Sequence, residues 1–173
     1  MKNWLVTWAA LAAFSVPFVV GGPAQAIVIA GAVIDITQVG ANVMMTGSGV
    51  IDLDGLQLNS SGPFPANGVI WPDAAEILVG SSANDGVDIY TSASGPTTMG
   101  SGAESVGSSG LGGLFGVGTA LLGTPVIYVP KGYMTDTPLS GTSMFDNTTL
   151  AALGLTPGTY VYTWAAPPLR MAA

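Results

Sequence analysis

Apolar and polar residues alternate along several short stretches of the chain, which is the pattern of strands with one buried and one exposed face. Residues 34–37 and 43–46 follow it, and the turn residues Gly40-Ala41-Asn42 between them predict a hairpin. Residues 51–54 alternate again, and Gly47-Ser48-Gly49 just before them predict a bulge or a bend in one long strand. This part of the chain is therefore expected to form antiparallel strands.

Further strands are predicted in the middle of the chain. Residues 77–79 and 87–90 are two predicted strands on either side of a polar turn, and residues 125–130 form a third, bounded by prolines. Residues 60–67 contain two prolines and a glycine and predict a loop. Residues 95–123 contain ten glycines in 29 residues, and their apolar members favour short strands joined by tight loops, with a flexible linker as the alternative.

The strongest helix signal lies near the C-terminal end. Asp146 or Asn147 can cap residues 148–153, and Gly154 suits a left-handed stop, so one short helix is expected there. A Pro-Gly pair typical of a type II turn then leads into a final strand, one face of which carries Tyr160, Tyr162 and Trp164. The pattern as a whole predicts an all-β fold, an antiparallel β-sandwich of roughly seven to nine strands with one short helix near 148–153.

The N-terminal 26 residues have the pattern of a secretory signal peptide. Lys2 precedes an apolar run over residues 4–20, and Ala24 and Ala26 place small residues where signal peptidase requires them, which predicts cleavage after Ala26. A membrane anchor is the rival interpretation, but the run has 17 residues, the short limit for a bilayer, and contains Pro17. The expected organisation is thus a signal peptide at 1–26, a β-sandwich domain at 27–164 and an irregular tail at 165–173.

The charge of the expected mature chain is strongly acidic. Lys131 and Arg170 oppose ten carboxylates, which gives a net charge of −8. Such a surface repels phosphate backbones and anionic lipids, so neither nucleic acid nor, after cleavage of the signal, a membrane is expected as a partner. Cysteine is absent, and an exported chain without it depends on its core rather than on disulfides.

Candidate catalytic chemistry is sparse. The chain has no histidine, the commonest general base, and Lys131 is the only lysine after the expected signal. The glycines of residues 110–116 do not complete a phosphate-binding motif, because position 115 is Phe115. No catalytic or cofactor-binding residue is therefore assigned and no enzyme is predicted, although carboxylates that meet only in the fold leave glycoside cleavage as a third interpretation.

Two aspartate clusters have the oxygen ligands that calcium prefers. Asp52 and Asp54 form one, and Asp85 and Asp88 form the other. Neither completes a calcium loop with a terminal glutamate, and Asp is common in turns because it bonds to its own backbone. Solvated turns are the expectation, and calcium binding at either cluster stays open.

Several segments resemble a family of bacterial proteins. The strongest is Leu153-Gly154-Leu155-Thr156-Pro157-Gly158-Thr159-Tyr160-Val161, within a longer similar stretch over residues 139–164. Residues 47–56 and 128–133 add to the likeness. Together they resemble exported PEP-CTERM proteins, which implies a protein of a Gram-negative bacterium associated with exopolysaccharide, biofilm or the cell surface, with no assigned enzyme activity.

The chain departs from this family after Trp164. Relatives continue with one more strand, Pro-Glu-Pro, a transmembrane helix and a basic end, and Ala165 to Ala173 contain none of these. The hypothesis is that a frameshift or truncation replaced the final strand and the sorting tail. The sheet would then have an open edge beside residues 160–164, and this edge is expected to favour self-association.

The sequence therefore predicts a non-enzymatic exported protein, a structural or interaction component of the bacterial surface or extracellular matrix, with the periplasm as an alternative location. Exopolysaccharide or other surface proteins are the expected partners, and no cofactor is expected. A carbohydrate- or calcium-binding module is the alternative function. Aromatic side chains on an open face would favour sugar binding, and the candidates are Trp71, Tyr90 and Tyr133.

Overall fold

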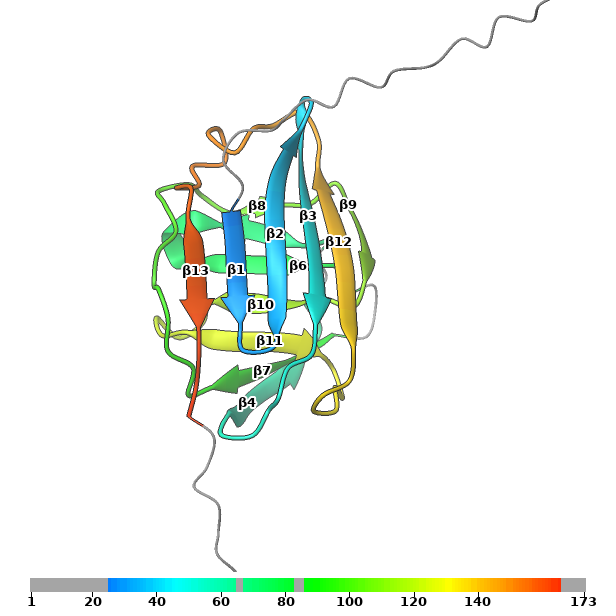
Figure 1. The fold of residues 1–173 in the computed structure, drawn as a ribbon, viewed down its shortest axis with the longest axis vertical. Coiled ribbons are helices and arrows are strands. Elements are labelled where there is room, and N and C mark those ends of the chain that lie inside the picture. The colour runs from blue at the N-terminus through cyan, green and yellow to red at the C-terminus, as the bar shows by residue number, and fades with distance from the viewer. Residues whose placement is uncertain (1–24, 65–66, 83–85, 166–173) are drawn as a thin grey trace, which may run out of the picture.

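The computed structural model describes residues 25–64, 67–82 and 86–165, and these form an all-β fold of two sheets. Thirteen strands lie in the described part of the chain, more than the seven to nine expected. In Figure 1 the two sheets form two layers, and the strands of the front sheet cross those of the rear sheet at a steep angle. This is a sandwich-like arrangement of two layered sheets.

The front layer, sheet A, contains six strands. Five of its six strands come from the two ends of the chain, so the sheet joins the N-terminal hairpin to the C-terminal strands. From edge to edge its order is β13 (Thr159–Tyr162), β1 (Gln25–Ile29), β2 (Ala32–Val39), β3 (Asn42–Gly49), β12 (Leu139–Phe145) and β9 (Ser109–Gly112).

The rear layer, sheet B, contains seven strands from the middle of the chain. Its order is β4 (Gln57–Gly62), β7 (Val87–Thr91), β11 (Val126–Pro130), β10 (Phe115–Gly118), β6 (Glu76–Val79), β5 (Val69–Trp71) and β8 (Ser105–Val106). Strand neighbours are antiparallel in both sheets, except that β13 runs parallel to β1. The expectation of a mainly antiparallel fold is confirmed.

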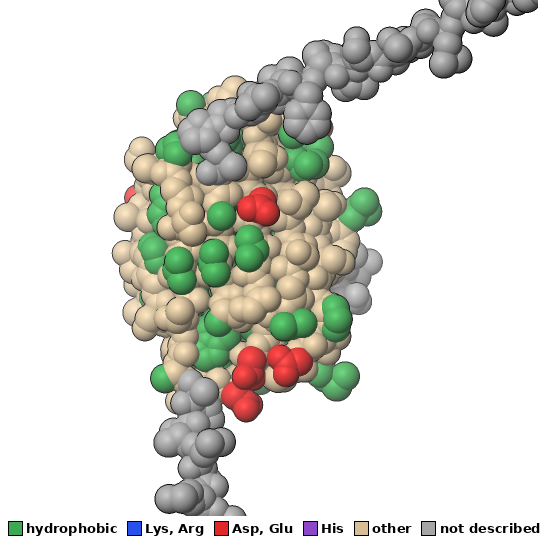
Figure 2. All heavy atoms as spheres, in the orientation of Figure 1, with side chains coloured by type: hydrophobic (Ala, Val, Ile, Leu, Met, Phe, Trp, Pro, Cys, Tyr) green, Lys and Arg blue, Asp and Glu red, His purple; other side chains and the backbone are tan. Residues whose placement is uncertain are grey.

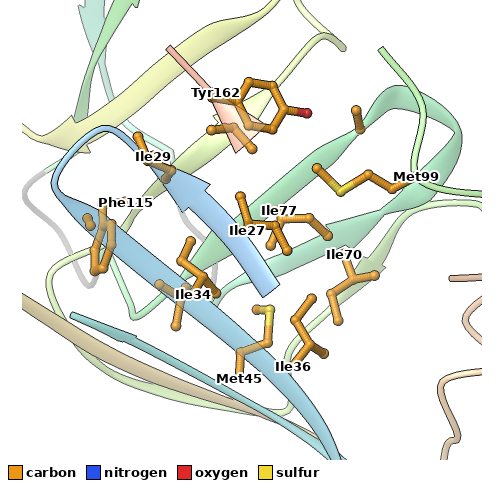
Figure 3. Packing of buried hydrophobic residues seen from close by; sticks show 14 of the residues in the cluster. Ile27, Ile29, Ile34, Ile36, Met45, Ile70, Ile77, Met99, Phe115 and Tyr162 are labelled. Atoms are coloured by element: carbon orange, nitrogen blue, oxygen red, sulfur yellow. The ribbon is translucent and has the colours of Figure 1, made fainter. Parts of the chain in front are cut away.

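The main core lies between the sheets. Alternate residues of β1, β2 and β3 point inward from sheet A and meet alternate residues of β5, β6, β10 and β11 from sheet B (Figure 3). Tyr162 of β13 is fully buried at one end of this core, and its hydroxyl donates a hydrogen bond to the Pro96 carbonyl oxygen at 2.9 Å. The alternation predicted for the first hairpin is thus confirmed, since Ile34 and Ile36 point inward while Asp35 is exposed.

A second apolar cluster lies on the other face of sheet B. It contains side chains of β5, β6, β7 and β11 with Phe64 and Trp71 packed against it, and Phe64 and Tyr128 place their ring centroids 5.7 Å apart. Sheet B is therefore buried on both faces along its central strands, which explains the continuous buried runs of β6 and β11.

The glycine-rich segment at residues 95–123 forms short strands with tight loops, as predicted, rather than a linker. Several of its glycines lie where backbones approach one another closely. A Cβ at Gly110 would lie 2.3 Å from the Gly80 carbonyl oxygen, and one at Gly116 would lie 2.0 Å from that of Ile77. The segment is ordered because only glycine leaves room for these contacts.

The expected helix near 148–153 is wrong. The described chain has no α-helix, and this segment forms a few hydrogen-bonded turns, including one from the Leu153 amide to the Thr149 carbonyl oxygen at 2.9 Å. Gly154 does take the left-handed conformation, with φ of 70°. The Leu155 amide instead bonds to the Leu150 carbonyl oxygen, and Leu155 forms a bridge with Gly100, so tertiary pairing ends the segment after one turn.

Three further predictions are wrong. Residues 51–54 do not form a strand, because β3 ends at Gly49 without a bulge and the chain turns, with the Leu56 amide bonded to the Leu53 carbonyl oxygen. Strand β4 occupies part of the expected loop at 60–67, where pairing with β7 orders a polar segment. Gly158 does not have the positive φ that a type II turn requires. The expected signal before residue 25 and the tail from residue 166 lie outside the described residues.

Candidate functional site: a hydroxyl-lined groove on sheet A

The outer face of sheet A carries a shallow groove of about 370 Å³ over β2, β3, β12 and β9. Register places four of its side chains in one row across the strands, because Thr46 pairs with Asp35 on one side and with Thr142 on the other, and Thr142 pairs with Leu111. Ser48 and Ser140 form the neighbouring row. We call this the hydroxyl groove, and its lining is Asp35, Thr46, Gly47, Ser48, Leu111, Gly112, Ser140, Gly141 and Thr142.

The groove forms because two strands have the same small-residue pattern. Thr46-Gly47-Ser48 on β3 runs antiparallel to Ser140-Gly141-Thr142 on β12, so the hydroxyl residues point outward and the glycines point toward the core. A Cβ at Gly47 would lie 2.5 Å from Val79 Cγ1, and one at Gly141 would lie 3.0 Å from Gly80 Cα. The glycines therefore let the two sheets approach closely beneath a floor of short polar side chains.

The floor hydroxyls are available to a ligand. Ser48, Ser140 and Thr142 are exposed and Thr46 is half-buried, and within the described part of the chain none of the four hydroxyl groups makes a hydrogen bond. The walls are chemically different, since Asp35 is an exposed carboxylate and Leu111 is an apolar side chain with 75% of its surface exposed. The groove thus combines hydroxyl groups, one carboxylate and one apolar wall.

The groove carries negative charge only. Asp35 is its one charged side chain. Lys131 is the one lysine or arginine of residues 25–165, and it lies in the turn that follows β11 of sheet B. Figure 2 shows this face with its mainly polar, uncharged surface. An anionic ligand would therefore find no cation in the groove.

The three aromatic residues considered for sugar stacking do not form an open platform. Trp71 is half-buried and packs on the second apolar cluster, and Tyr90 and Tyr133 are half-buried and pack on the main core. The Tyr133 hydroxyl accepts a hydrogen bond from the Ile51 amide at 2.9 Å and donates one to the Thr137 carbonyl oxygen at 2.7 Å. These three residues therefore do not provide the open aromatic face that would favour sugar binding.

The aspartate clusters have structural contacts. Asp52 Oδ1 accepts a hydrogen bond from the Asp54 amide at 2.9 Å, which is the local turn expected of aspartate. Asp88 is buried, and its Oδ2 accepts a hydrogen bond from the Gly132 amide at 2.8 Å, while Asp85 lies outside the described residues. Across residues 25–64, 67–82 and 86–165, no group of three or more His, Cys, Asp or Glu side chains could hold a metal ion.

A buried carboxyl group that the sequence did not indicate lies on sheet B. Glu76 is 3% exposed at the start of β6, and the Tyr128 hydroxyl donates a hydrogen bond to its Oε2 at 3.2 Å. Burial raises the pKa of Glu76 from 4.5 to about 7, which outweighs the lowering by the Tyr128 bond, and Glu104 raises it slightly further. Burial and the neighbouring Glu76 also raise the pKa of Tyr128. The space for this carboxyl comes from Gly118, where a Cβ would lie 2.8 Å from Glu76 Oε2.

One of the two residues expected at the signal cleavage site, Ala26, lies at the start of sheet A. Ala24 is outside the described residues, whereas Ala26 belongs to β1 and pairs with Asp35 and Thr159. Gln25 is 1% exposed, and its Nε2 donates a hydrogen bond to the Thr156 carbonyl oxygen. Cleavage after Ala26 would therefore remove the first two residues of β1.

The chain matches no model of a known protein family. No curated protein matches it in sequence, and no solved structure matches it in fold. None of the helices among the described residues is long and apolar enough to cross a membrane.

Proposed function

We propose that this chain is a non-catalytic, exported component of the bacterial surface or extracellular matrix that binds neutral polysaccharide through the hydroxyl groove. One observation carries this proposal, namely the row of outward hydroxyl groups on β3 and β12 that make no hydrogen bond within the described chain. The resemblance of residues 139–164 to exported PEP-CTERM proteins supports the location and the class of partner.

The chemistry of the groove suits sugar hydroxyl groups. Each Ser or Thr hydroxyl can both donate and accept a hydrogen bond, and an ionised carboxylate such as Asp35 accepts from two sugar hydroxyls at once. The Leu111 wall offers an apolar contact for the CH face of a sugar ring. Strands of sheet A pass beneath the groove without interruption, so a linear polymer can lie across several rows.

The charge of the site favours a neutral polymer over an acidic one. The whole chain has a net charge of −7, and the groove holds Asp35 without a cation. A polymer of uronic acids would be repelled over the first Debye length, whereas an uncharged glucan would not. Without an aromatic platform the affinity per site is expected to be weak, roughly millimolar.

The experiment is affinity electrophoresis of the purified protein through gels that contain dextran, a soluble cellulose derivative without charge, or alginate. We expect dextran or the cellulose derivative to retard the protein and alginate to leave its mobility unchanged. The test variant T46V/T142V replaces two floor hydroxyls by methyl groups of the same shape, and valine suits a strand. It should lose the retardation.

The control variant is T37V, since Thr37 lies on the same face of β2 but outside the lining of the groove. It should be retarded as strongly as the unchanged protein. Equal retardation of T46V/T142V and T37V, or stronger binding to alginate than to the neutral polymers, would contradict the proposal.

A further inference from the structure

Strand β13 is an edge of sheet A with unpaired backbone groups. The Ala26 amide bonds to the Gly158 carbonyl oxygen at 3.1 Å, and the Ala30 amide bonds to the Tyr162 carbonyl oxygen at 3.3 Å. The backbone N–H and C=O groups of the even-numbered residues of β13 therefore face β1. The backbone groups of Thr159, Val161 and Thr163 consequently face away from β1.

Only part of this outer edge is covered by the rest of the described chain. Thr163 bonds to Ser94 through both its amide and its carbonyl group, at 2.9 and 2.7 Å. The amide and carbonyl groups of Thr159 and Val161 have no backbone partner in the described ranges. Among the described residues, two donors and two acceptors therefore remain unpaired, side by side, on the edge of the sheet.

The other three sheet edges have features that oppose strand addition. Strand β4 carries a register shift between Leu58 and Ser60, β8 has only two residues, and β9 contains Gly112 with φ of 80°. Bulges, short strands and irregular backbone are the devices by which proteins protect edges. Strand β13 is regular and contains no charged residue, proline or glycine.

An apolar row leads to this edge across the outer face of sheet A. Val161 pairs with Val28, and Val28 pairs with Val33 on the next strand. Val161 is 49% exposed and Val33 is 38% exposed. Figure 2 shows the row of hydrophobic side chains over β13, β1 and β2. Exposed apolar side chains therefore lie next to the open edge, although the net charge of the protein is −7.

We infer that β13 pairs with β13 of a second copy of this chain, in antiparallel orientation. If Thr159 of each copy lies opposite Val161 of the other, the two free donors and two free acceptors of each strand are satisfied reciprocally. This register ends before Thr163, where Ser94 already occupies the edge. The pairing joins the two sheets A into one continuous sheet.

A second copy fits better than an unrelated strand for two reasons. The edge is self-complementary, because the same two residues supply all donors and acceptors on both sides of a two-fold axis. The two Val161 side chains become diagonal neighbours, so the apolar rows of the two copies meet. The hydroxyl grooves lie on the β2 to β9 side of each sheet and stay open, which gives the dimer two grooves on one surface.

Sedimentation velocity of the purified chain across the micromolar range tests the pairing. We expect a concentration-dependent dimer. The variant V161K places a charge at the edge and should weaken dimerisation by about tenfold or more. The control V39K changes a valine of nearly equal exposure, 48%, at the far end of β2 and should dimerise like the unchanged chain. A monomer at every concentration, or equal dimerisation of V161K and V39K, would overturn the inference.

Cross-linking tests the register even if V161K fails to fold. The chain has no cysteine, so T159C and V161C introduce single thiols. A mixture of the two variants should form a mixed disulfide under mild oxidation more readily than either variant forms its own. Absence of the mixed disulfide in a folded mixture would contradict the proposed pairing.

Discussion

The contribution of the Glu76 carboxyl group to stability should depend on pH in the direction opposite to that of a carboxyl group whose pKa is lowered on folding. Glu76 is buried on sheet B beside Tyr128, with no cation to pair with it in the described chain. Its pKa rises from 4.5 to about 7 in the folded protein because burial disfavours the charged form. The folded state therefore holds a proton that the unfolded state has lost between these two pH values.

The sign and size follow from proton linkage. The contribution of Glu76 to stability is fully present below about pH 4.5 and is lost as the pH rises through about 7. Since one pKa unit is about 1.4 kcal/mol, the difference between 4.5 and about 7 sets an upper limit of about 3 to 4 kcal/mol. Residual solvation of the carboxyl lowers the expected effect to about 2–3 kcal/mol.

The variant E76Q removes the charge and keeps an oxygen that can accept the Tyr128 hydrogen bond. At pH 8 it should be more stable than the unchanged protein by about 2–3 kcal/mol, a rise in Tm of about 5–10 °C for a chain of this length. At pH 4.5 the two proteins should melt within about 2 °C of each other, because both side chains are then uncharged. Thermal unfolding followed by circular dichroism between pH 4.5 and 8 measures this.

The control is D35N, because Asp35 is exposed and its removal should change Tm similarly at both pH values. The reasoning would be refuted if E76Q melted below the unchanged protein at pH 8, or if the Tm difference between E76Q and the unchanged protein did not change with pH.

Three further outcomes are expected. S143A should lower the free energy of unfolding, measured in urea, by about 2–3 kcal/mol. The reason is that the buried Ser143 hydroxyl accepts a hydrogen bond from the Gly80 amide at 2.9 Å and donates one to the Gly80 carbonyl oxygen at 3.1 Å. A loss below about 0.5 kcal/mol would contradict this expectation. A chain that begins at Ile27 should be less stable than one that begins at Gln25 by about 2–4 kcal/mol. The shorter chain lacks the hydrogen bond from Gln25 to Thr156 and the first strand pairs of β1. Equal urea midpoints would show that Gln25 and Ala26 do not stabilise the sheet. EDTA should leave Tm unchanged, because Asp52 and Asp88 accept hydrogen bonds from backbone amides and the described residues contain no group that could hold a metal ion. A lower Tm would indicate a bound metal ion.

The strands with large apolar side chains were predictable from alternation, and those with small ones were not. Strands β2 and β3 present large apolar side chains to the core at alternate positions, namely Ile34, Ile36, Val43 and Met45. Strand β12 alternates as regularly, but two of its inward residues are Gly141 and Ser143, so its sequence has no hydrophobic period. Strand β4 is polar apart from Leu58 and Gly62 and shows no alternation, and it is a strand because β7 pairs with it.

The hydroxyl groove could not be predicted from the local sequence pattern. The sequence predicts a strand at residues 43–46 and a bulge or bend at Gly47-Ser48-Gly49, and it does not indicate a ligand-binding segment at Thr46-Gly47-Ser48. The role of this segment becomes visible only when register places Thr46 opposite Thr142, 96 positions later in the chain. The contact between Glu76 and Tyr128 also spans 52 positions. Close approach of backbones and long-range register, rather than residue type, determine these sites.

The most direct test of the proposed polysaccharide binding is a nuclear magnetic resonance titration of the isotope-labelled protein with neutral glucan oligosaccharides. If the hydroxyl groove binds them, the largest shifts should fall on the amides of Thr46, Ser48, Ser140 and Thr142, with much smaller shifts on sheet B and with alginate oligosaccharides. Shifts confined to sheet B, or no shifts at millimolar oligosaccharide, would contradict the account.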